Sequence, residues 1–223
     1  MSNSNYVTPF GWQTSEAPPS HHILEPLILD ICKKFRIHKA LDFGCGNGSL
    51  SRSLQEAGME VTGCDADMQG IEIAAQCTSQ VKYVHMAGYE DPQKLGDDNF
   101  DAVISTEVIE HLFLPRYLPR FAKAVLRPGG YLIISCPYHG YLKNLLISLL
   151  NKWDAHHDSL KDGGHIKFWS YKTLTQLIQG EGFKVLEFHG AGRFRFLWKS
   201  MIIVAREISS PNYRPTKAPL QPK

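Results

Sequence analysis

The stretch LDFGCGNG, residues 41–48, decides the fold. An apolar strand pattern at 39–43 runs into three glycines spaced by single residues, and a helical pattern follows at 49–57. Glycine permits positive φ, and because it has no Cβ it lets the backbone approach a ligand closely. A strand, a glycine loop and a helix in this order predict a nucleotide-binding arrangement. A tight turn without any ligand is the alternative, since a single glycine pattern is weak evidence.

Strand and helix patterns alternate on both sides of this loop. Helices are expected at 23–35, 68–77, from Pro119 to about 126, and at 170–180 with Ser170 as N-cap. Further strands are expected at 60–64, 81–85, 101–105, 131–136, 184–189 and 201–206. The alternation predicts an α/β fold, a parallel sheet with helices on both faces. Only the last two strands lack a helix between them, so they should form an antiparallel hairpin.

Composition and charge narrow the classes of protein. A chain of 223 residues with 43% hydrophobic content suits one globular domain with a full core. The net charge of +2 gives no strong field for nucleic acid or an acidic membrane. Five scattered cysteines without a C-x-x-C pair predict neither a disulfide framework nor a thiolate zinc site. With no signal-peptide or membrane-span pattern, the expected location is the reducing cytoplasm.

The chain ends differ in composition from the middle. Residues 1–20 are polar and read as a flexible arm, although Phe10 and Trp12 can fold onto the domain. Residues 209–223 are rich in Pro and Lys and are expected to be a disordered tail. The expected catalytic domain is 21–208, with an insert at 137–165.

An acid follows the glycine loop at an informative distance. Asp65 ends the second strand, close to the ~20-residue separation at which a carboxylate meets a ribose hydroxyl pair. The alternative is an acid that favours the dipole of the next helix. The spacing departs from G-x-G-x-x-G, because Ser49 occupies the place of the third glycine. This departure disfavours a dinucleotide with its pyrophosphate.

Four segments together resemble the class I, Rossmann-like methyltransferases that use S-adenosylmethionine. They are LDFGCGNG at 41–48, VTGCDAD at 61–67, NFDAV at 99–103 with EVIEHL at 107–112, and LRPGGY at 126–131. The resemblance covers about residues 23–207. It implies a three-layer fold around a seven-stranded, mostly parallel sheet whose last strand is antiparallel, which agrees with the terminal hairpin.

The resemblance also implies a binding site for S-adenosylmethionine. The glycines approach the amino acid end of the cofactor, Asp42 supports the loop and meets the amino group, and Asp65 takes the ribose hydroxyls. The segment AGYE at 87–90 departs from the commoner Gly-Asp-Ala pattern of the adenine loop. The candidate cofactor residues are Asp42, Gly44, Cys45, Gly46, Asn47, Gly48, Asp65, Ala66, Gly88, Tyr89 and Thr106.

An acid–histidine cluster follows the strand at 101–105, whose C-terminal end faces the ligand crevice. Glu107, Glu110 and His111, at i, i+3 and i+4, would share one face of a helical turn. A solvated, salt-bridged helix end is the alternative. The string EVIEH resembles both the ubiquinone-pathway O-methyltransferases and the small-RNA terminal 2′-O-methyltransferases. In the RNA enzymes it binds a divalent metal with a second histidine, and His165 matches the place of that histidine.

Two mechanisms for removing a proton from an alcohol remain open. In one, Glu107, Glu110, His111 and His165 hold Mg²⁺, Mn²⁺ or Zn²⁺, which lowers the pKa of the acceptor. In the other, His111 is the base and a glutamate orients it. We therefore take His111 and Glu107 as the candidate catalytic residues.

The insert has a strongly apolar centre at 141–153, which predicts a helix. The expected role is a lid over the acceptor pocket. A core helix and a surface that touches lipid are the alternatives.

The leading functional hypothesis is methyl transfer from S-adenosylmethionine to a hydroxyl group of a small molecule, with no nucleic-acid partner. An RNA 2′-O-methyltransferase is the second, disfavoured by the near-neutral charge and the lack of a basic, aromatic stripe. An NAD-dependent oxidoreductase is disfavoured by Ser49. A non-catalytic cofactor-binding protein is disfavoured by the acid–histidine cluster.

Overall fold

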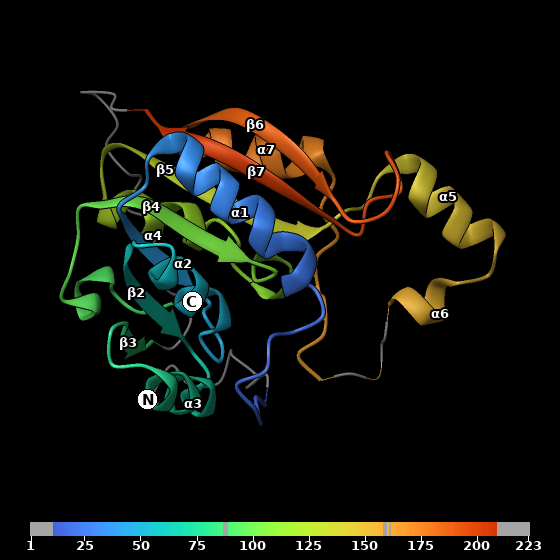
Figure 1. Ribbon diagram of the computed structural model, residues 1–223. Helices are drawn as coiled ribbons and strands as arrows, with labels where there is room; N and C mark the ends of the chain where they lie inside the picture. Colours follow the sequence, from blue (N-terminus) through green and yellow to red (C-terminus); the bar gives the residue numbers. More distant parts are fainter. Residues whose placement is uncertain (1–10, 87–88, 158–159, 161, 209–223) are drawn as a thin grey trace.

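The computed structural model describes residues 11–86, 89–157, 160 and 162–208. Strands and helices alternate along the chain as the sequence predicts (Figure 1). The elements are α1 His21–Phe35, β1 Lys39–Phe43, α2 Ser49–Glu56, β2 Glu60–Asp65, α3 Met68–Cys77, β3 Lys82–His85, η2 Pro92–Leu95, β4 Phe100–Thr106, η3 Ile109–His111, α4 Tyr117–Val125, β5 Leu126–Pro137, α5 Tyr141–Leu149, α6 Trp153–His156, α7 Tyr171–Gly180, β6 Phe183–Ala191 and β7 Ser200–Glu207.

Local signals explain the start of α7 and the place of Pro119 in α4. Ser170 caps α7 as predicted, because its hydroxyl accepts from the backbone N–H of Thr173 in a capping box. The helix expected to open at Pro119 begins instead at Tyr117. Pro119 then lies in the first turn, where a missing N–H costs no intrahelical hydrogen bond.

The sheet has seven strands in the order β3-β2-β1-β4-β5-β7-β6. Strand β7 runs antiparallel to both β5 and β6, and the other neighbours are parallel. The predicted three-layer fold and terminal hairpin are confirmed. The chain winds outward from β1 to β3 and then returns to place β4 on the other side of β1. Ligands bind in the crevice outside the C-terminal ends of strands at such a reversal.

Alternate residues of the central strands pack into two hydrophobic cores, one on each face of the sheet. Leu41 and Phe43 of β1 face the side covered by α4 and α7, where Phe121 is fully buried. Ala40 faces the side covered by α1 and α2, together with Ile28. The period-two alternation is the property of an extended strand with both faces buried. Two cores on one sheet fix the positions of the strand ends, where the site lies.

Gly48 closes the loop after β1 at φ 73° and is the N-cap of α2. A Cβ at Gly48 would lie 2.5 Å from the hydroxyl of Tyr83 and 2.8 Å from the Cβ of Ala74. Both the backbone angle and the space therefore require glycine. The loop is pressed against β3 and α3 rather than standing free.

The insert departs from its prediction. The helix expected at 141–153 ends at Leu149, and a short second helix, α6, follows. Both project from the domain (Figure 1). Within the described residues, no helix is long and apolar enough to cross a membrane.

Gly48→Ala should destabilise the protein more than Gly58→Ala, by about 1–3 kcal/mol. Both glycines have positive φ, but a Cβ at Gly58 meets no atom within 4 Å. In Gly58→Ala only backbone strain therefore destabilises the protein, whereas in Gly48→Ala overpacking adds to that strain. Urea unfolding of both variants measures the difference, and equal losses would contradict the close packing of the loop.

Candidate active site

A cavity of about 840 Å³ opens at the C-terminal ends of β1, β2 and β4. This volume lies within the range of small-molecule and cofactor sites. Its wall includes many of the predicted residues: Asp42, Gly44, Cys45, Asp65, Ala66, Tyr89, Thr106, Glu107, His111 and His165. The start of the glycine loop and Glu107, His111 and His165 of the acid–histidine cluster therefore face one cavity, whereas Glu110 is fully buried and is not among its lining residues.

Asp42 lies fully buried beneath the glycine loop. Its Oδ2 accepts a hydrogen bond from the Ser51 hydroxyl at 2.6 Å, whereas Oδ1 accepts none from a described residue. Burial raises the pKa of this carboxyl to about 7, against the lowering effect of Ser51. An unpartnered carboxylate oxygen at a cavity wall fits a cationic ligand.

Asp65, at the end of β2, braces the loop from the other side. Its Oδ2 accepts from Gly46 N at 2.8 Å and its Oδ1 accepts from Asp67 N at 2.7 Å. Burial raises its pKa. An ionised carboxylate has about four acceptor positions, so each oxygen keeps one for a ligand hydroxyl. The arrangement is compatible with the ribose role that the resemblance implies.

Residues 11–20 lie over the loop. Of the two aromatic residues considered for this packing, Trp12 folds onto the domain, and Phe10 lies outside the described residues. A Cβ at Gly46 would lie 2.4 Å from the Trp12 ring. Asn47 is buried and donates to the carbonyls of Thr14 and Glu16.

The loop residues thus divide into two groups. Gly44 and Cys45 line the cavity, whereas Gly46, Asn47 and Gly48 are not among its lining residues. Gly88 lies outside the described residues. Sequence analysis allowed Trp12 to fold onto the domain but did not place it at the glycine loop, where the absence of a Cβ at Gly46 and at Gly70 leaves room for its ring.

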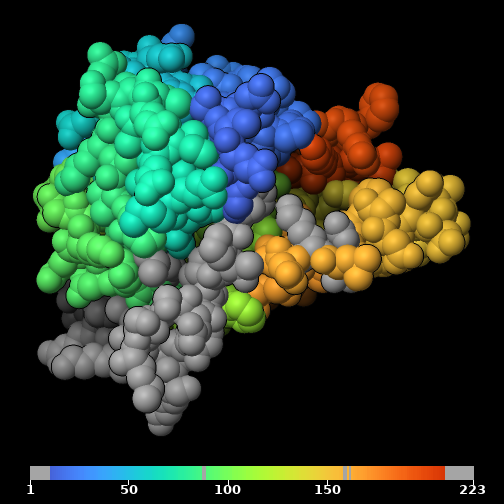
Figure 2. Space-filling model, turned by 90° about the horizontal axis from the view of Figure 1, so that it is seen from below, coloured from blue at the N-terminus to red at the C-terminus, as the bar shows by residue number. Residues whose placement is uncertain are grey.

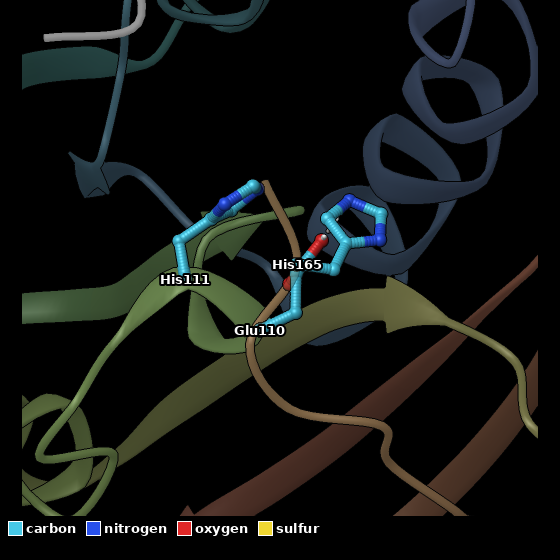
Figure 3. A group of neighbouring side chains, drawn as sticks. All are labelled: Glu110, His111 and His165. Carbon is cyan, nitrogen blue, oxygen red and sulfur yellow. Dashed lines mark ion pairs between the residues drawn. The ribbon is translucent and has the colours of Figure 1, made fainter. Parts of the chain in front are cut away.

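Glu110, His111 and His165 form a compact group (Figure 3). One ligand atom from each lies within 4.8 Å of the others, and the two imidazole rings are 4.9 Å apart between centroids. Glu110 and His111 come from η3, and His165 comes from the segment before α7. The predicted return of the chain to this crevice is confirmed.

Glu110 is fully buried, and neither of its carboxylate oxygens accepts a hydrogen bond from a described residue. His165 Nε2 lies 3.9 Å from Oε1. Burial and the nearby Glu107 carboxylate raise the pKa of Glu110. A buried carboxylate with two unused oxygens beside two imidazoles fits a divalent cation.

The His111 ring has a defined orientation. Its Nδ1 lies 2.8 Å from the carbonyl oxygen of Gly163 and 3.2 Å from that of Gly164. A carbonyl only accepts, so Nδ1 carries the hydrogen and Nε2 carries the lone pair. Metal ligands and general bases are both held this way by a backbone carbonyl.

Glu107 requires a correction. The expectation of one helical face for Glu107, Glu110 and His111 is wrong, because Glu107 has φ 55° and η3 begins only at Ile109. The Glu107 carboxylate accepts from the hydroxyls of Ser135 and Ser200, at 2.9 and 3.2 Å. Glu107 lines the cavity but is not part of the three-residue group.

The lid role expected of the helix at 141–153 also requires a correction, because α5 contributes no residue to the cavity wall, although the later part of the insert does. The wall is completed instead by described residues between His156 and Phe168. Phe113 and Phe168, 59% and 53% exposed, also line the cavity, and sequence analysis did not identify them. Single aromatic residues in irregular segments carry no periodic signal that would have identified them.

Residues 21–187 match the methyltransferase domain family. The ubiquinone biosynthesis O-methyltransferase of Hydrogenovibrio crunogenus is 30% identical over 153 residues, 66% of this chain and 63% of that protein. The mitochondrial enzyme of the same name from Arabidopsis thaliana is 36% identical over 111 residues, 46% of this chain and 33% of that protein. This chain spans less than two thirds of the length of these relatives.

Solved structures share the fold. The magnesium protoporphyrin IX methyltransferase of Synechocystis, with bound SAH, has a TM-score of 0.62 at 18% identity, over 83% of this chain and 82% of that one. A SAM-dependent methyltransferase from Aquifex aeolicus has a TM-score of 0.63 at 16% identity, over 86% of this chain and 94% of that one.

The unfolding free energy of ligand-free Asp42→Asn, measured relative to that of the wild type, should be higher at about pH 8 than at about pH 5. The folded pKa of about 7 exceeds the usual 3.8, so wild-type stability falls as pH rises between these values. The amide cannot ionise and escapes that loss, which is on the order of 1–3 kcal/mol. Urea unfolding at both pH values, with the exposed Asp30→Asn as control, measures the effect. A pH-independent difference would contradict the raised pKa.

Proposed function

We propose that this chain, which belongs to the class I S-adenosylmethionine-dependent methyltransferases, methylates a hydroxyl group of a small molecule. The family excludes the alternative of an NAD-dependent oxidoreductase. The observation that carries the proposal is the group of Glu110, His111 and His165 at the cavity that also holds the glycine loop.

The cofactor end of the cavity suits a cation. S-adenosylmethionine supplies a methyl group on a positively charged sulfur. Asp42 offers its unpartnered Oδ1 to the ammonium of the amino acid end, and Asp65 offers its remaining lone pairs to the ribose hydroxyls. Ala66, Tyr89 and Thr106 complete the wall around them. Trp12 packs its ring against Gly46 and also lines the cavity.

The acceptor end suits a substrate that carries a hydroxyl group on an otherwise apolar molecule. A sulfonium donor loses its charge in the transfer, so the protein need not stabilise an oxyanion on the donor side. The acceptor hydroxyl must lose its proton, and the lone pair on His111 Nε2 can take it. Phe113 and Phe168 add apolar surface to the wall of the same cavity. Glu107, held by Ser135 and Ser200, contributes a negative charge close by.

The same three residues fit a divalent metal. Glu110, His111 and His165 would hold Mg²⁺, Mn²⁺ or Zn²⁺, and the metal would lower the pKa of the alcohol. The two unused oxygens of Glu110 support this version of the mechanism. The metal-free version assigns Glu110 to orienting the histidines.

Transfer of a tritiated methyl group tests the function. The purified protein is incubated with labelled S-adenosylmethionine and either a small-molecule extract or RNA. Label in the small-molecule fraction is expected. Label in RNA would favour the second candidate, a 2′-O-methyltransferase, which the Glu110–His111–His165 group also fits. The five free cysteines, four of them buried, support a reducing compartment such as the cytoplasm.

Asp65→Ala should weaken binding of S-adenosylhomocysteine at least about tenfold, since each charge-assisted hydrogen bond contributes about 1.5–3 kcal/mol. Calorimetry measures the affinity, with the exposed Asp30→Ala as control for lost charge. Asp65→Asn keeps one acceptor oxygen toward Gly46, so its affinity should lie between those of Asp65→Ala and Asp30→Ala. Wild-type affinity in Asp65→Ala would refute the ribose assignment.

His111→Ala should lower the rate of methyl transfer about 10²–10⁴-fold and leave cofactor affinity unchanged, because the residue acts on the acceptor. The exposed His22→Ala is the matched control. His165→Ala separates the two mechanisms. The metal version predicts loss of Mn²⁺ binding by calorimetry and inhibition of the wild type by EDTA, whereas the metal-free version predicts neither. Full activity in His111→Ala would contradict both.

A further inference from the structure

Residues 11–20, which we call the strap, lie across the glycine loop from the outside. Figure 2 shows the start of the described chain, in dark blue, at the surface of the molecule against the teal segments. The side chains of residues 13–17 are exposed, whereas Trp12 is half-buried. Trp12 lines the cavity, and so do Pro18, Pro19 and Ser20 at the other end of the strap. The strap is therefore part of the cavity wall as well as a connection at the surface.

The Trp12 ring sits in a notch that two glycines leave open. A Cβ at Gly46 would lie 2.4 Å from Cζ2 of the ring, and a Cβ at Gly70 would lie 2.8 Å from Cδ1. The Cβ at Gly70 would also lie 2.9 Å from the carbonyl oxygen of Gly46. A side chain at either glycine would therefore displace the ring. Because Gly46 follows β1 and Gly70 lies in the first turn of α3, the ring joins the two elements that border the cofactor end of the cavity.

The ring lies next to the acid proposed to bind the ribose hydroxyls. Gly46, on which the ring packs, donates its N–H to Asp65 Oδ2 at 2.8 Å. Gly11, the neighbour of Trp12 in the chain, donates its N–H to Asp67 Oδ2 at 2.9 Å. The backbone N–H of Asp67 in turn donates to Asp65 Oδ1 at 2.7 Å. The strap thus begins at the same turn that carries the Asp65 carboxylate, and an aromatic ring there offers an apolar face to the C–H groups of a sugar.

Asn47 holds the strap on the domain. This residue is fully buried, and its Nδ2 donates to the carbonyl oxygens of Thr14 and Glu16, at 2.9 and 2.8 Å, so both amide hydrogens are used. Arg52 Nη2 donates to the carbonyl oxygen of Ser15 at 2.9 Å. Few apolar contacts hold the strap besides the Trp12 ring, because the side chains of residues 13–17 are exposed. A segment held in this way opens at a lower free energy than the whole domain unfolds.

We propose that Trp12 contacts the cofactor, with its indole ring over the ribose of S-adenosylmethionine, and that the strap opens to let the cofactor in and out. The position over the ribose rests on the proposed role of Asp65, whereas the opening of the strap does not. Each turnover exchanges S-adenosylhomocysteine for S-adenosylmethionine, so the strap opens once in every catalytic cycle. The proposal also gives a role to Asn47, a residue of the glycine loop that is not among the lining residues of the cavity.

Intrinsic fluorescence of the full chain tests the contact between the ring and the cofactor. All four tryptophans (Trp12, Trp153, Trp169 and Trp198) lie within the described residues, and of these Trp12 alone lines the cavity. Titration with S-adenosylhomocysteine should change the emission of the wild type. Trp12→Phe should lose most of this change while still binding the ligand in calorimetry. Trp153→Phe removes an exposed tryptophan of α6 and is the control that should retain the change.

The exchange kinetics of the ligand test the opening of the strap. Tritiated S-adenosylhomocysteine is bound, an excess of unlabelled compound is added, and the label that stays on the protein is followed in time. Trp12→Ala should raise the dissociation rate at least about tenfold, because loss of a ligand contact acts mostly on dissociation. Trp12→Phe retains a ring and should stay within about threefold of the wild type. Gln13→Ala changes the exposed neighbour in the strap and should leave the rate unchanged. Asn47→Ala frees the strap but keeps the ring, so it should raise both association and dissociation.

A wild-type dissociation rate in Trp12→Ala, or a fluorescence change that survives in Trp12→Phe, would overturn the contact. Tighter binding by Trp12→Ala would overturn it as well, because the ring would then compete with the cofactor for the same space. A faster dissociation without faster association in Asn47→Ala would contradict the opening of the strap.

Thermal unfolding of each variant identifies misfolding. If Asn47→Ala does not fold, Arg52→Ala loosens the strap by removing its hydrogen bond to the Ser15 carbonyl, and the same two rates are expected to rise. Weak binding by Asp65→Ala with no effect of Trp12→Ala would leave the ribose assignment standing and remove the role of Trp12. Because these measurements need no acceptor, their failure is distinct from a failure of methyl transfer to a small molecule.

Discussion

Two hydrogen bonds to one carbonyl oxygen hold the proposed acceptor site together. The backbone N–H groups of Ile166 and Lys167 donate to the Glu110 carbonyl, at 3.0 and 3.1 Å. They bring a segment more than 50 residues away in the sequence against η3. The same contact places His165 beside the Glu110 carboxylate. It also places the Gly163 carbonyl beside the His111 ring. Without it, the group would consist of two neighbouring residues on a short 3₁₀ turn and an unrelated histidine.

The cofactor side depends on buried acids that weaken the ligand-free fold. Asp42 is enclosed beneath the glycine loop with one oxygen unpartnered, and burial raises its pKa. A cationic ligand would stabilise the ionised carboxylate. The burial that destabilises the ligand-free protein would therefore favour the binding of a cation. Glu110 shows the same pattern at the acceptor side. At or beside each end of the cavity there is therefore a buried carboxylate with at least one oxygen that accepts no hydrogen bond from the described residues.

The fold could be predicted because its signals are local. The strand before Gly44, the turn chemistry at Ser170 and the missing helix between β6 and β7 each act within a few residues. The shared position of Glu110 and His111 with His165 followed from topology and a family pattern. The error at Glu107 arose because a positive φ at a non-glycine residue has no sequence signal, and only the serines of β5 and β7 explain it. The roles of α5 and Trp12 depend on long-range packing, which apolar content alone does not specify.

The central claim is that the Glu110–His111–His165 group acts on an acceptor next to the methyl donor. A crystal structure of the protein with bound S-adenosylhomocysteine tests it most directly. The account predicts that the thioether sulfur points toward His111 Nε2, with room for one acceptor hydroxyl group between them. A sulfur directed away from His111, or separated from it by other side chains, would contradict the account.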